Sequence, residues 1–149
     1  MTETVLFAGV LALVAWFVWN VWSVVQVFKG LRERFWTRPM WWLRILSVSL
    51  FTGTAAWLFG AFSGGLDVEE SCRLTHHQHY DSAYRSAHAE EFQRLFPLSN
   101  KCNASYDLVP SWVNPTVAAC FVIAVLCVLA LGRLGLSRAL TVKRKELRS

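Results

Sequence analysis

The chain has 149 residues, of which 54 % are hydrophobic and only 17 % are charged, and its formal net charge at pH 7 is +5. An average soluble domain has about 25 % charged residues, and here the apolar residues are gathered in three long runs. This composition argues against an ordinary water-soluble domain. The positive charge flanks the apolar runs, so it gives no reason to expect a nucleic-acid partner.

The first apolar run extends from Val5 to Phe28, which exceeds the roughly 20 residues that a helix needs to cross a bilayer. Positive charge follows the run instead of preceding it, the reverse of a cleaved secretory signal. We therefore expect residues 1–28 to form a retained transmembrane helix. The polar side chains of Asn20, Ser23 and Gln26 should face other helices or the membrane interface, because they are costly against lipid.

A short basic segment and the second apolar run come next. We predict a cytoplasmic loop over residues 29–44 and a second transmembrane helix over residues 45–63. Small residues recur every four positions along this helix and its end, which places them on one face and lets another helix approach closely. The neighbour can be another span of this chain, a second copy or a partner protein. This predicted helix-packing face consists of Thr52, Ala56, Gly60 and Gly64.

The distribution of Lys and Arg predicts the orientation, because these residues stay on the cytoplasmic side of membrane spans. Five lie in residues 29–44 against one acid, and six follow residue 132 against one acid. The segment 64–112 has four basic residues and seven acids. We therefore expect a plasma-membrane protein with its N-terminus outside, its C-terminus in the cytoplasm and residues 64–112 outside as an extracytoplasmic cap.

The cap contains two of the four cysteines, Cys72 and Cys102. An exported location permits disulfides, so we predict that these two cysteines are bonded to each other. Between them, Asp81 as a capping residue, a series of alanines and the stop at Pro97 predict a helix from Ser82 to Phe96. The segment after Pro97 is rich in Asn and Ser and is predicted to be an ordered loop held by the disulfide.

All four histidines of the chain lie in the cap. His76, His77 and His79 are close enough in sequence to chelate copper or zinc from a loop, since neutral imidazole is a ligand for both metals. His88 is too distant along a straight helix to join His77 on one metal ion. The spacing matches no strong zinc motif, so we expect hydrogen-bonded or solvated surface histidines in place of a metal site, and no cofactor is predicted. Sensing of pH by the histidine cluster is a further alternative.

The third apolar run predicts a transmembrane helix over residues 113–132, followed by a basic cytoplasmic tail over residues 133–149. Asn114 and Pro115 are expected to cap and begin this helix. The basic residues at its end are typical of a contact with anionic lipid, which makes the bilayer the first expected partner.

The sequence therefore indicates an all-α integral membrane protein with three transmembrane helices and a disulfide-bonded, partly helical extracytoplasmic loop. No catalytic arrangement is apparent, so we expect a non-enzymatic accessory or assembly subunit that contacts other membrane proteins or itself. The alternatives are binding or sensing of copper or zinc through the His-rich loop, and an oligomeric channel or immunity-type protein.

Overall fold

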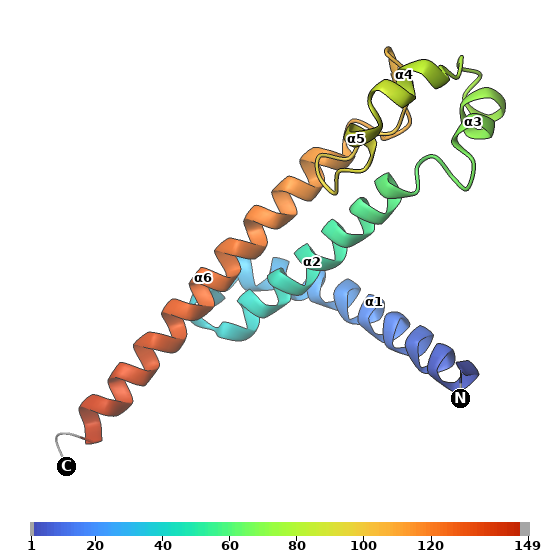
Figure 1. Cartoon of the computed structure of the whole chain (residues 1–149). Coiled ribbons are helices and arrows are strands. Elements are labelled where there is room, and N and C mark those ends of the chain that lie inside the picture. The colour runs from blue at the N-terminus through green and yellow to red at the C-terminus, as the bar shows by residue number, and fades with distance from the viewer. Residues whose placement is uncertain (1, 147–149) are drawn as a thin grey trace. The chain divides into compact units, whose positions relative to one another are not determined.

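The computed structural model describes residues 2–146, so Met1 of the first predicted span and Arg148 of the predicted tail lie outside the described residues. The described chain is mostly helical. Three helices are long and apolar enough to cross a membrane, which confirms the predicted fold class at this level. They are α1 (Thr2–Arg32), α2 (Pro39–Ala61) and α6 (Val113–Glu146), labelled in Figure 1.

The long helices extend beyond the apolar runs that predicted them. α1 continues past residue 28 to Arg32, and α2 begins at Pro39 instead of residue 45. The connection is therefore only residues 33–38, part of which is a 3-10 turn, η1 (Phe35–Thr37). α6 likewise continues to Glu146 through the predicted tail. Lys and Arg are good helix formers, so a helix can continue beyond the point where the apolar sequence ends.

The chain divides into two compact units, and the first comprises Met1–Phe51 with Cys120–Ser149. Its described interior contains a short polar chain: Trp16 Nε1 donates to Ser47 Oγ at 3.3 Å, and Ser47 Oγ donates to the Asn20 side-chain oxygen at 3.2 Å. Ser23 is also buried, as we expected for polar side chains of α1 that avoid lipid. These hydrogen bonds join α1 to α2.

The second unit, Thr52–Ala119, contains the end of α2, the start of α6 and the whole cap. Two clusters of buried residues form its core, one around the paired cysteines with Leu108, and one of Leu98, Val109 and Val113. Its short elements are α3 (Val68–Glu70), a π-helical turn η2 (Ser71–Thr75), α4 (Ser82–Ala87), α5 (Ala89–Phe92), β1 (Lys101–Asn103) and β2 (Tyr106–Asp107).

The two strands form an antiparallel hairpin that the sequence analysis did not predict. Lys101 pairs with Asp107 and Asn103 pairs with Tyr106, with an irregularity in the register between the two pairs. The hairpin occupies part of the segment that was expected to be loop.

The single helix predicted over residues 82–96 is wrong. Asp81 does cap its start, because its side chain accepts a hydrogen bond from Tyr84 N at 2.9 Å. The helix is interrupted at His88, however, and α5 ends at Phe92. The chain after it is held by other partners, since Leu95 O accepts a hydrogen bond from Trp57 Nε1 at 2.9 Å. This tertiary contact replaces the helical hydrogen bonding that local propensity favoured.

The predicted capping role of Asn114 is also wrong. α6 begins at Val113, so Asn114 lies inside its first turn. Its side chain instead donates to Leu98 O and accepts from Leu98 N, both at 2.8 Å. Asn114 therefore binds the backbone of a distant loop residue, and Pro115 is tolerated because it still lies in the first turn of the helix.

Candidate functional site

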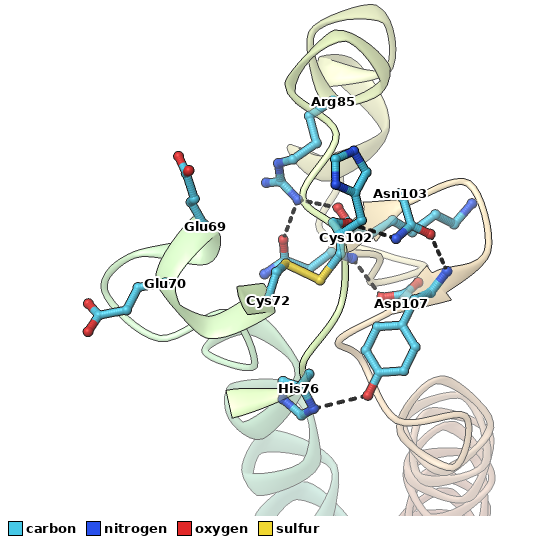
Figure 2. The surroundings of a disulfide bond; sticks show 12 residues. Glu69, Glu70, Cys72, His76, Arg85, Cys102, Asn103 and Asp107 are labelled. Atoms are coloured by element: carbon cyan, nitrogen blue, oxygen red, sulfur yellow. Dashed lines mark hydrogen bonds between the residues drawn. A yellow bond between two sulfur atoms is a disulfide. The ribbon is translucent and has the colours of Figure 1, made fainter. Parts of the chain in front are cut away.

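The cap, residues 64–112, is built around the disulfide between Cys72 and Cys102, whose Cα atoms are 5.8 Å apart. Both cysteines are 0 % exposed. Their backbone carbonyls are also used: Cys72 O accepts from Gln78 N at 2.8 Å, and Cys102 O accepts from Asp81 N at 2.9 Å. As Figure 2 shows, the bond ties the turn η2 to the hairpin strand β1.

Asp107 stabilises the chain on both sides of the hairpin. One carboxylate oxygen accepts hydrogen bonds from Asn100 N and Val109 N, both at 2.9 Å, and the other accepts from Ser99 Oγ at 3.2 Å. Hydrogen bonds to a charged acceptor are stronger than those between neutral groups. Asp107 thus fixes the path of the chain into and out of the hairpin.

Asn103 forms the turn between the two strands. Its side-chain oxygen accepts from Ser105 N at 2.9 Å and from Tyr106 N at 3.1 Å, while its amide nitrogen donates to His79 O at 2.8 Å. An Asn that hydrogen-bonds the backbone two residues later is a typical turn former. Here the same side chain also holds the segment that follows η2.

Arg85 links α4 to the hairpin. Its guanidinium donates to Asn100 Oδ1 at 3.0 Å and to Lys101 O, and it lies over the Phe92 ring at 4.5 Å from the ring centre. Lys101 in turn donates to Glu91 at 3.3 Å. That hydrogen bond is the main cause that raises the pKa of Lys101, so the ammonium form is favoured.

The structure does not bring the predicted histidine ligands together. His76 is half-buried and its Nδ1 lies 3.0 Å from the Tyr106 hydroxyl, whereas His77 and His79 are exposed. Within residues 2–146, no three His, Cys, Asp or Glu side chains are arranged to hold a metal ion.

The acidic residues of the cap that could add to a metal site do not converge on the histidines. Asp81 caps α4, and Glu69 forms an ion pair with Arg73 at 3.1 Å. Figure 2 shows Glu69 and Glu70 pointing away from the disulfide.

The predicted small-residue face belongs to the second unit and is mostly buried. Ala56, Gly60 and Gly64 are buried, whereas Thr52 is exposed. A Cβ atom at Gly60 would lie 2.7 Å from Val113 Cγ1 and 2.8 Å from Leu98 Cδ1. At Gly64, which follows the end of α2, a Cβ atom would collide with the Asn100 side chain. At these two positions the face is used for close packing within the chain.

Sequence reasoning missed Asp107, Arg85 and Asn114 as the residues that hold the cap together. The partners of Arg85 and Asn114 are 15 to 16 positions away. Local signals existed for Asn103, in the Asn and Ser content of its segment, and for Asp107, whose side chain accepts from a backbone N–H two residues later.

No protein-family model, no curated protein and no solved structure matches this chain. No family is therefore assigned to it.

Proposed function

We propose that the chain is a three-span membrane protein of the plasma membrane, with its N-terminus and its cap outside and its C-terminus in the cytoplasm. Two features support the proposal. The three long apolar helices have the length that spans require. The basic residues are concentrated in residues 29–44, in and around the connection between α1 and α2, and after residue 132, while the cap has more acids than bases, as the positive-inside rule requires.

Labelling of single cysteines in intact cells tests this orientation. In a chain with Cys120 and Cys127 replaced by Ala, Leu66→Cys should react with a membrane-impermeant maleimide, since Leu66 is a fully exposed cap residue. Glu33→Cys, in the connection between α1 and α2, should react only after the membrane is permeabilised. Protection of position 66 together with labelling of position 33 in intact cells would invert the proposed topology.

Within the membrane, the proposed role is that of an accessory or assembly subunit that binds another membrane protein through the N-terminal half of α1. The observation that carries this proposal is the uneven packing of α1. Trp16 packs on Phe51 with ring centres 5.0 Å apart and hydrogen-bonds Ser47. Asn20, Ser23 and Gly30, farther along α1, are buried. Residues 5–15 are instead all exposed, and the large apolar side chains from Val5 to Val14 are 53–70 % exposed.

The exposed half of α1 also has the composition of a helix contact. Ala8 and Ala12 are exposed and four positions apart, so they lie on one face, and a Cβ atom at the neighbouring Gly9 would meet nothing within 4 Å. Small residues at this spacing allow two membrane helices to approach closely. Because the small residues Gly60 and Gly64 are packed against this chain's own side chains, α1 is the better candidate for a partner.

Site-specific photocrosslinking tests the proposed role. A photoreactive phenylalanine analogue is placed at Phe7 on α1 or, as the control, at Phe121 on α6. The two are the same residue type, with exposed fractions of 67 % and 70 %. In native membranes, position 7 should form a discrete protein adduct whose partner is identified by mass spectrometry, and position 121 should not. Lipid adducts alone at position 7, or equal protein adducts at both positions, would contradict the proposal.

A further inference from the structure

The segment between α5 and Leu98 is held against two of the long helices, at Leu95 and at Leu98. Trp57 Nε1, on α2, donates to Leu95 O at 2.9 Å. The Asn114 side chain, in the first turn of α6, makes two hydrogen bonds of 2.8 Å with the backbone of Leu98. This segment is therefore fixed beside the end of α2 and the start of α6.

The side chains of this segment point to different surroundings. Leu98 is buried with Val109 and Val113. Leu95 and Phe96, in contrast, are 75 % and 49 % exposed, and Arg94 before them is also exposed. Two adjacent large apolar side chains are thus presented outward by a backbone that is fixed on both sides.

The level of Trp57 on α2 indicates what these side chains meet. Trp57 lies four residues before the end of α2, which is about 6 Å along the axis of an α-helix. This is the last turn of a candidate membrane span, where Trp is typically found at the boundary between lipid and water. Because Trp57 bonds the backbone of Leu95, the segment reaches the same level.

We propose that Leu95 and Phe96 form a lipid-inserting tip, in which both side chains enter the acyl region of the outer leaflet and Arg94 meets the phospholipid phosphates. The inference rests on the proposed insertion of α2 into the membrane. An irregular backbone does not occur in the hydrocarbon core facing lipid, so the backbone of the tip stays in the interfacial layer. Burial in lipid removes the apolar surface of both side chains from water, and a guanidinium can pair with a phospholipid phosphate through two parallel hydrogen bonds.

Spin labels on the full-length protein test this inference. In a chain with Cys120 and Cys127 replaced by Ala, a nitroxide is attached to Leu95→Cys and the protein is reconstituted into vesicles of phosphatidylcholine and phosphatidylglycerol. Power saturation compares collisions with oxygen, which concentrates in lipid, and with a water-soluble nickel complex. Leu74→Cys, at an exposed apolar residue of η2 in the cap, is the aqueous control, and Phe121→Cys on α6 is the lipid control.

The expected result at position 95 is high oxygen and low nickel accessibility. The ratio of oxygen to nickel accessibility should be close to that at position 121 and at least several-fold higher than that at position 74. High accessibility to nickel at position 95 would overturn the tip while position 121 still reports lipid. Low accessibility to both reagents would also overturn it, because the tip would then be covered by protein, such as a second copy. High nickel accessibility at position 121 would instead refute the membrane-spanning proposal itself.

Discussion

Replacing both Cys72 and Cys102 with Ala is expected to destabilise the cap by about 3 to 4 kcal/mol, the value that the chain-entropy model gives for a closed loop of this length. The two cysteines are 30 positions apart. Both cysteines are 0 % exposed. The double replacement with Ala removes the bond without leaving an unpaired thiol buried in its place. The short elements of the cap, none longer than 6 residues, have little stability of their own.

Hydrogen exchange of individual amides measures this loss. Gln78 N and Asp81 N donate to the carbonyls of the two cysteines, so their exchange reports the opening of the region around the bond. Their exchange should become roughly 10²- to 10³-fold faster, since each 1.4 kcal/mol corresponds to about a factor of ten. Cys120→Ala, at a cysteine that forms no disulfide, is the control and should leave both rates unchanged.

Unchanged exchange at both amides in the double variant would contradict the prediction. It would mean that the hydrogen bonds of Asp107, Asn103 and Arg85 hold the cap without the covalent bond. Faster exchange at Gln78 N alone would mean that the bond stabilises η2 and not the hairpin.

The parts of this fold that depend on local composition could be predicted from the sequence. Three uncharged apolar runs are enough to predict three long helices, because apolar length is what a bilayer requires. The pairing of Cys72 with Cys102 could be predicted because these are the two cysteines outside the apolar runs. Asp81 as a helix cap is also a local property, since its partner is only three residues away.

The parts that depend on distant partners could not be predicted. Nothing near Leu95 in the sequence indicates that Trp57, 38 positions earlier, would hold its carbonyl. Nothing near Asn114 indicates that it would bind Leu98 instead of capping α6. The partner of His76 is a further example, because its ring nitrogen lies beside the Tyr106 hydroxyl, 30 positions away, and closeness in sequence to His77 and His79 gives no sign of this contact.

Gly60→Leu is expected to destabilise the second unit by about 1 to 3 kcal/mol, the usual cost of adding side-chain volume to a packed core. A Cβ atom at this position would already lie within 3 Å of both Val113 and Leu98. Leu98 can move its side-chain end, but Val113 is β-branched, stiff and 0 % exposed. The end of α2 would therefore have to move away from the start of α6.

Gly132→Leu is the matched control, since it makes the same change within a long helix at a position where a Cβ atom meets nothing within 4 Å. Thermal unfolding of the two purified variants in the same detergent should show a clear loss of stability for position 60 alone. The comparison also decides what the small residues of α2 are for. If Gly60 served contact with a second protein, Gly60→Leu would leave the isolated chain as stable as Gly132→Leu and would lose only the complex. Because Val113 and Leu98 already fill the space in front of Gly60, we expect the isolated chain itself to be destabilised, and the contact with a partner to remain the task of α1.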